Sequence, residues 1–270
     1  AQPSVSRHLA VLRSGDLIAN RREGNRVYCS AALPDTMPEA LREFINQLGR
    51  TPHADLDRLD AVLAERARSA SQFADRTAAC WDNVGKLLHQ SSALLTALAD
   101  LAPGGMDIAD LGTGTGLLLP FLSRMASRVH AVDQSHQMLR RAQRRCETRE
   151  LTNVHFHQRA LEDLTQADFR VHASLLHFVL HQVASPASVL DSLGNVLHPG
   201  GRLVIVDRLP HQDEEAKKTF GSLWLGFSRT QLADWLEQGG LAIADWAELP
   251  ATENGQGEPE VFVLAAVKTS

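Results

Sequence analysis

The sequence predicts an α/β fold in which a parallel β-sheet is covered by helices on both faces. From about residue 72 onward, short apolar segments alternate with segments of helical periodicity, which is the pattern of such a sheet. The first strand, 108–111, runs directly into a glycine-rich turn, and the second, 129–133, ends in an acid. These two features together predict a nucleoside pocket at the carboxyl ends of the strands.

The other elements of this region follow in order along the chain. A helix is predicted after the glycine turn, with Leu118, Phe121, Leu122 and Met125 facing inward, and Ser135 is placed to cap the next helix. Further strands are predicted at 154–157, 171–178, 203–207, 241–246 and 261–267, and His198-Pro199-Gly200-Gly201 is predicted as the turn before 203–207.

Composition is that of an ordinary globular protein. Of the 270 residues, 44% are hydrophobic and 22% are charged, which excludes a wholly disordered, collagenous or disulfide-scaffold chain. No apolar run reaches the ~18–20 residues of a membrane span, and the amino terminus lacks the hydrophobic region of a signal peptide. Cys29, Cys80 and Cys146 are scattered and form no CxxC motif. We therefore expect a cytoplasmic protein without membrane contact.

The first 32 residues are a small basic segment ahead of an acidic body. They carry five arginines against two acids in a chain whose net charge is −5. Apolar residues recur at helical spacing over 4–14, with Ser4 or Ser6 placed as the helix cap and Gly15 as the helix end. Residues 17–29 predict a two-stranded ribbon with an arginine-rich tip. Such a helix and ribbon can contact a major groove and its flanking phosphates.

The order of these elements resembles the recognition helix and wing of ArsR-type winged-helix repressors. Val5–Leu9, Leu12–Arg13, Gly15–Ile18 and Arg21–Tyr28 carry the resemblance, although the three helices that come first in that family do not precede them here. A helix and hairpin packed on the body would explain the same pattern. The resemblance implies DNA contacts from Ser4, Ser6, Arg7, His8, Arg13, Arg21, Arg22 and Arg26.

Residues 33–71 are predicted to be connecting helices with apolar stripes, between a partial winged helix at 1–32 and the α/β domain at 72–270. In the winged-helix family the corresponding helix supports dimerisation, so the resemblance implies a homodimer. Packing within one chain would explain the same stripes.

The glycine turn favours one ligand class. The turn is Gly112-x-Gly114-x-Gly116, in which missing β-carbons allow a ligand to approach the backbone, and Asp133 is placed to accept hydrogen bonds from a ribose. Dinucleotide folds use G-x-G-x-x-G instead. Asp110 would repel a phosphate but attract an ammonium, which favours a nucleoside that bears an amino acid over NAD.

Asp110–Gly116, Val132–Ser135, Met138–Leu139 and Leu197–Leu203 together resemble the motifs of class I S-adenosylmethionine-dependent methyltransferases, over residues 72–270. This resemblance implies a Rossmann-like, seven-stranded sheet with an antiparallel last strand. It also implies S-adenosylmethionine or S-adenosylhomocysteine as ligand and a small-molecule methyl acceptor. The cofactor-binding residues that it implies are Asp110, Gly112, Thr113, Gly114, Gly116, Asp133, Gln134, Met138, Leu161 and His177, with Phe73 and Trp81 in a segment that folds over the ligand.

One feature of that family is missing. Many relatives carry an acid that meets the adenine amino group after the third strand, and Ala160 stands at this position, with Glu162 and Asp163 following. Either a neighbouring acid or backbone groups replace it, or the affinity for the cofactor is reduced.

The residues that act on the methyl acceptor are less clear than the cofactor site. Weak candidates are His177 and His181, which share one face if the segment is helical, and Asp207. The alternative is that His177 lines the pocket through its backbone and that His181 is a satisfied side chain. No HExxH motif or cysteine cluster accompanies these histidines, so no metal is expected.

Two functions fit these observations. The first is a small-molecule methyltransferase joined to a DNA-binding head. The second is a transcriptional regulator whose methyltransferase fold senses S-adenosylmethionine or S-adenosylhomocysteine without turnover. A nucleotide-dependent oxidoreductase would rest on the glycine turn alone.

Overall fold

The computed structural model of the chain describes residues 2–23, 26–32, 37–49, 54–81, 104–214, 221–249 and 260–269. The chain divides into two compact units, 1–62 and 63–270. Helix α3 (Ala54–Trp81) runs unbroken through residue 71, where the sequence predicted a domain boundary. None of the described helices is both long enough and apolar enough to cross a membrane.

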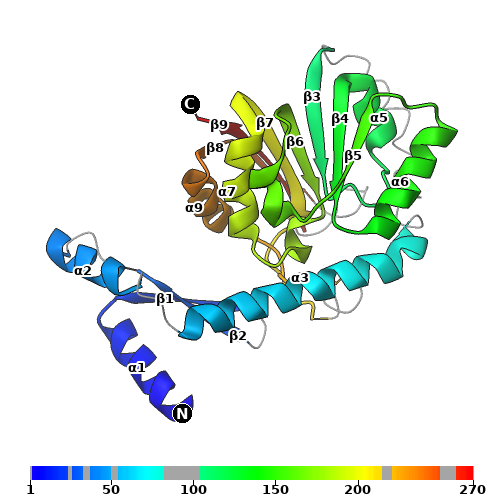
Figure 1. Cartoon of the computed structure of the whole chain (residues 1–270). Coiled ribbons are helices and arrows are strands. Elements are labelled where there is room, and N and C mark those ends of the chain that lie inside the picture. Colours follow the sequence, from blue (N-terminus) through cyan, green and yellow to red (C-terminus); the bar gives the residue numbers. More distant parts are fainter. Residues whose placement is uncertain are drawn as a thin grey trace. The chain divides into compact units, whose positions relative to one another are not determined.

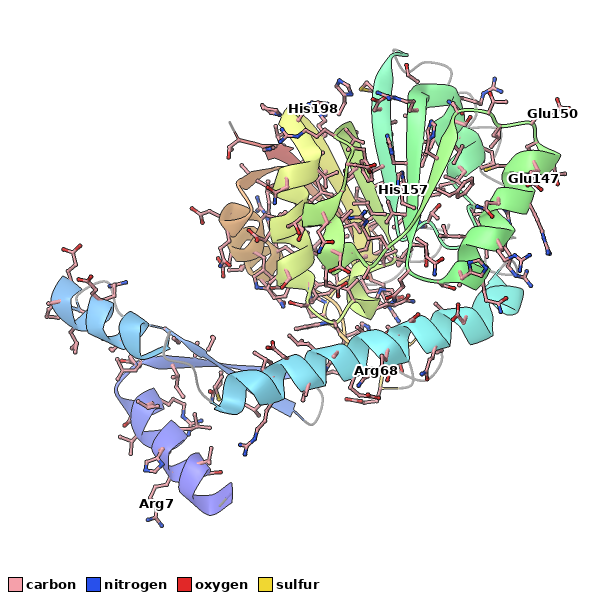
Figure 2. All side chains as sticks on the ribbon, viewed as in Figure 1. Arg7, Arg68, Glu147, Glu150, His157 and His198 are labelled. Atoms are coloured by element: carbon pink, nitrogen blue, oxygen red, sulfur yellow. The ribbon has the colours of Figure 1, made fainter. Side chains whose placement is uncertain are left out.

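The first unit contains the predicted helix and ribbon. Helix α1 (Gln2–Ser14) is followed by strands β1 (Ile18–Glu23) and β2 (Arg26–Ala31), which pair antiparallel. Helix α2 (Glu39–Gly49) and the start of α3 follow. Arg7 is exposed and extends from α1 away from the ribbon (Figure 2).

The predicted start of α1 needs correction, whereas its predicted end at Gly15 is confirmed, because the last helical residue is Ser14. Ser4 and Ser6 lie inside the helix, which starts before them, so neither is its cap. At the other end the left-handed residue is Asp16, with φ of 54°, and not Gly15. The backbone N–H of Asp16 bonds the carbonyl of Arg13 at 3.0 Å. A short polar side chain such as that of Asp tolerates the left-handed conformation, so the glycine is not needed there.

The second unit is built on a seven-stranded sheet in the order β5-β4-β3-β6-β7-β9-β8 (Figure 1). Strand β9 runs antiparallel to its neighbours β7 and β8, and the pairs from β5 to β7 are parallel. The predicted seven-stranded sheet with an antiparallel last strand is confirmed. The strands are β3 (Met106–Leu111), β4 (Ala126–Asp133), β5 (Val154–Gln158), β6 (Val171–His177), β7 (Leu197–Arg208), β8 (Leu241–Leu249) and β9 (Val261–Lys268).

The described helices cover both faces of the sheet. Helices α5 (Leu119–Met125) and α6 (His136–Thr148) lie on one face, and α7 (Pro186–Val196) and α9 (Arg229–Gln238) on the other (Figure 1). Successive residues of β3 serve the two cores: Ile108 belongs to the core with α5 and α6, whereas Ala109 belongs to the core with α7 and α9. As predicted, Ser135 caps α6, because its hydroxyl accepts a bond of 3.1 Å from the backbone N–H of Met138.

Two local predictions about this unit are wrong. Strand β7 begins at Leu197, so the predicted turn at 198–201 lies within the strand; the pairing with β6 jumps from Val171↔Leu197 to Ala173↔Arg202, which makes this segment a bulge. His177 and His181 do not share a helical face. His177 ends β6, and His181 lies in the short 3-10 helix η3 (Leu180–Gln182).

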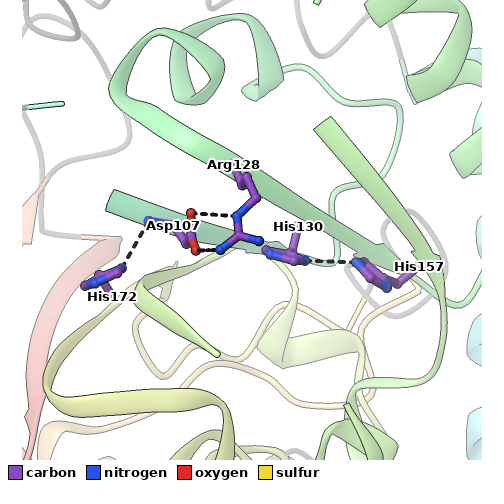
Figure 3. A network of polar contacts seen from close by, with 5 residues as sticks. All are labelled: Asp107, Arg128, His130, His157 and His172. Carbon is purple, nitrogen blue, oxygen red and sulfur yellow. Dashed lines mark hydrogen bonds and ion pairs between the residues drawn. The ribbon is translucent and has the colours of Figure 1, made fainter. Parts of the chain in front are cut away.

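A group of polar side chains joins the strands away from the glycine turn (Figure 3). Asp107 of β3 pairs with the guanidinium of Arg128 on β4, with oxygen–nitrogen distances of 2.5 and 3.1 Å. Nδ1 of His130 lies 3.0 Å from Nε2 of His157. His130 is buried, and burial, together with neighbouring charges, lowers its pKa to about 4. The ring of His130 is therefore neutral at pH 7.

Candidate active site

A cavity of about 550 Å³ lies in the second unit, where β3, β4 and β6 end. Its size is typical of a small-molecule site. Of the residues predicted to bind the cofactor, those that line the cavity are Phe73, Asp110, Gly112, Thr113, Gly114, Asp133, Gln134, Met138, Leu161 and His177. Gly116 does not line it, and the side chain of Trp81 lies outside the described residues.

The three glycines of the turn all have positive φ: 73° at Gly112, 54° at Gly114 and 75° at Gly116. A β-carbon on Gly112 would lie 2.5 Å from a methyl group of Val179, and one on Gly116 would lie 3.0 Å from the β-carbon of Ala142. The space beside these two glycines is thus filled by the protein itself. They are needed for the turn and its packing, and Gly112 also lines the cavity.

The carboxylate of Asp133 is held at the end of β4 by two backbone donors. The N–H of Gly114 donates to Oδ2 and the N–H of Ser135 donates to Oδ1, both at 2.8 Å. The hydroxyl of Ser135 also donates to the carboxylate of Asp75 on α3. Burial raises the pKa of Asp133 to about 6, and the two backbone bonds partly oppose this rise.

Asp110 is a second buried acid, at the end of β3. The hydroxyl of Thr113 donates to its Oδ2 at 2.6 Å. Burial raises the pKa of Asp110 to about 6, and the nearby charge of Asp133 adds to the rise. Among the described residues, neither acid forms an ion pair with a basic side chain. The two carboxylates therefore make this end of the cavity favourable for a cation.

His181, a weak catalytic candidate, also lines the cavity, and Asp207 lies behind it. Nδ1 of His181 is 2.8 Å from Oδ1 of Asp207, and the side chains are 5% and 0% exposed. Burial lowers the pKa of His177, a residue that also lines the cavity. The structure thus brings His181 into contact with Asp207, a candidate that sequence spacing had not related to either histidine.

Several lining residues were missed by the sequence analysis. Ala67, Ala70 and Ala74 of α3 line the cavity. Their spacing of three and four residues along a helix was the signal that could have found them. Phe178 also lines the cavity with φ of 54°, an unusual value for a bulky residue. Glu162 is the neighbouring acid that lines the cavity, and its Oε1 accepts the N–H of Ala184 at 3.2 Å.

Comparison with known proteins identifies the central part of this unit. Residues 108–201 match the family described as "Methyltransferase domain". The chain carries a class I, S-adenosylmethionine-dependent methyltransferase domain. The match covers β3 to the start of β7, which includes the glycine turn and both buried acids.

The chain is similar to several methyltransferases over part of their length. It is 33% identical over 111 residues to the tRNA 5-carboxymethoxyuridine methyltransferase of Escherichia coli K12, which covers 40% of this chain and 42% of that protein. It is 32% identical over 151 residues to the demethylmenaquinone methyltransferase of Clavibacter sepedonicus, covering 54% and 61%. The DhpI–SAH complex superposes with a TM-score of 0.54 at 22% identity, over 75% of this chain and 97% of that one, which shows the shared fold.

The residues present fit S-adenosylmethionine. Two buried acids without basic partners in the described chain suit a ligand with two cationic groups, and a carboxylate held by backbone donors suits a ribose diol. The hydroxyl oxygen of Thr115, which lines the cavity, is buried without a hydrogen-bond partner. A polar ligand would satisfy this group, because an unpaired buried hydroxyl is costly.

Proposed function

We propose that this protein transfers a methyl group from S-adenosylmethionine to a small molecule bound in the cavity described above. The observation that carries the proposal is the pair of buried acids, Asp110 and Asp133, on either side of a glycine turn in a methyltransferase domain. S-Adenosylmethionine supplies a methyl group that its sulfonium already activates, so the enzyme has mainly to position the reactants.

In this proposal each acid has a separate task. Asp133 accepts hydrogen bonds from the ribose hydroxyls, since backbone donors fix both of its oxygens. Asp110 attracts the ammonium of the methionine moiety directly or through water, and Gln134 and Met138 flank the ribose or adenine. Glu162 takes the place of the absent acid near adenine, because it is the nearby acid that lines the cavity.

The experiment combines binding with turnover. Calorimetry should show binding of S-adenosylmethionine and S-adenosylhomocysteine, and incubation with labelled donor and a metabolite extract should label an acceptor. Binding of both ligands without label transfer would instead favour the sensor function, in which the fold detects the ligand without turnover. Absence of binding would reject both.

We also propose that residues 1–32 are the recognition helix and wing of an ArsR-type DNA-binding head, in a protein that acts as a homodimer. The observation that favours this is the succession of α1 and the antiparallel hairpin β1–β2, with Arg7 and Arg13 exposed on the helix. The predicted contacts Ser4, Arg21, Arg22 and Arg26 have side chains outside the described residues.

Salt dependence tests the head. In duplex-binding titrations with the full chain, Arg7→Ala should weaken binding and reduce the slope of log affinity against log salt by about one, as expected for one lost phosphate contact. Arg68→Ala is the control: this residue lies on α3 in the second unit, where it pairs with Glu65, and its slope should not change. Equal slopes for wild type and Arg7→Ala would reject this phosphate contact.

A further inference from the structure

The two histidines that line the cavity differ in their surroundings. His177 ends β6, and in the described part of the chain its ring has an edge contact with Phe178, with centroids 4.9 Å apart. The ring of His181 instead faces a buried carboxylate at 2.8 Å. Only the second arrangement orients an imidazole through a charge-assisted hydrogen bond.

The contacts of Asp207 fix both the carboxylate and the histidine. Besides the ring of His181, Asp207 accepts the backbone N–H of His181 at 3.2 Å and that of Arg208 at 2.8 Å. An ionised carboxylate is an acceptor only, so Nδ1 of His181 carries the ring proton. With Nδ1 as the donor, Nε2 is the ring atom that can accept a proton, and His181 lines the cavity.

On the basis of the proposed methyltransferase function, we infer that His181 is the general base for an acceptor with a hydroxyl group, and that Asp207 is its positioning residue. A hydroxyl is a weak nucleophile until its proton leaves, whereas a neutral amine already has a free lone pair. A buried, pre-oriented base is therefore of use mainly to a hydroxyl.

The cavity wall indicates the rest of the acceptor. Ala70, Phe73, Val183 and Val261 line the same cavity, which suits an apolar body that carries the hydroxyl. In the step, the acceptor oxygen gives its proton to Nε2 of His181 and bonds the methyl carbon, whose bond to sulfur breaks with its electron pair going to sulfur. The protonated His181 then returns its proton to solvent.

Two probes with the same apolar ring test the inference. 1-Naphthol offers an acidic hydroxyl, and 1-naphthylamine offers an amine that is uncharged at neutral pH. With labelled S-adenosylmethionine, the protein should methylate 1-naphthol. His181→Gln should lower kcat by at least about 100-fold, the lower end of the range for general base catalysis.

Asp207→Asn should lower kcat by at least about tenfold, because an amide no longer holds the imidazole of His181 in a single tautomer. A residue with a purely structural role would leave that tautomer unchanged. His155→Gln, on the exposed side of edge strand β5, is the matched control and should keep the wild-type rate.

A second readout does not depend on turnover. Nitrogen NMR of labelled histidines should show His181 with Nδ1 protonated and Nε2 unprotonated, and Asp207→Asn should mix the two tautomers. If calorimetry shows no binding of S-adenosylhomocysteine, the proposed function fails. If the ligand binds, three results each overturn the assignment of His181 as the general base: transfer to 1-naphthylamine alone, transfer to neither probe, or a wild-type rate in His181→Gln.

Discussion

The two ends of strand β3 hold acids of opposite character. Near the amino end, a hydrogen bond from the Arg128 guanidinium holds the pKa of Asp107 below its usual value. Three residues later, burial raises the pKa of Asp110 to about 6. The first acid is paired within the protein, and the second has no basic partner among the described residues. Residue type therefore does not distinguish a structural acid from a ligand-binding one; the surroundings do.

The largest expected difference concerns the glycines that flank β3. Gly112→Ala should destabilise the protein by about 2–3 kcal/mol, because its β-carbon would lie 2.5 Å from Val179 and the residue keeps φ of 73°. Gly104→Ala, before the strand, meets nothing within 4 Å and should leave stability within about 0.5 kcal/mol. Urea unfolding measures both free energies. Equal destabilisation by the two substitutions would contradict the packing role of Gly112.

The next comparison is between Asp133, which has no basic partner among the described residues, and Asp107, which is paired with Arg128. Asp133→Ala should weaken binding of S-adenosylhomocysteine at least about tenfold, or ~1.4 kcal/mol, because it removes the proposed acceptor of the ribose hydroxyls. Asp107→Ala should leave the affinity within about twofold, since its carboxylate is bound to Arg128 away from the cavity. Calorimetry at pH 7.5 measures both. Wild-type affinity in Asp133→Ala would remove the ribose assignment.

The smallest expected effect is a pH dependence of stability from the histidines of β4 and β5. The pKa of His130 is about 4 in the folded protein and ~6.5 in the unfolded chain, so the unfolded chain binds more protons between these values. Stability should fall as the pH drops from 6.5 towards 4. Protonation of His130 should lower the unfolding free energy by about 1–2 kcal/mol, a value reduced to allow for screening by solvent. Burial also lowers the pKa of the neighbouring His157, so this histidine changes stability in the same direction.

The variant His130→Gln isolates this contribution. Between pH 7 and pH 4.5 its unfolding free energy should decrease less than that of the wild type, while His136→Gln, at an exposed position at the start of α6, should follow the wild type. Urea unfolding at both pH values supplies the comparison. Parallel losses in all three proteins would show that His130 does not carry the effect.

The order of helices and strands could be predicted from the sequence because it depends on local patterns of apolar residues. Alternating apolar segments predicted the strands, and the capping position of Ser135 predicted the start of α6. Predictions from local sequence failed where pairing with a neighbouring strand decided the backbone conformation. The segment 198–201 reads as a turn, yet pairing with β6 keeps it inside β7 as a bulge. The end of α1 at Gly15 was predicted correctly, although the left-handed residue is Asp16.

For the candidate site, the sequence by itself determined the glycine turn and the acid that ends the second strand, because both follow directly from strands whose apolar patterns are local. Tertiary structure decided the rest. The contact between His181 and Asp207 joins residues 26 positions apart, and the wall from α3 comes from a helix that lies before the sheet in the chain. The raised pKa values of Asp110 and Asp133 also arise only on folding, because the packing of other elements removes the water that would otherwise stabilise their charges.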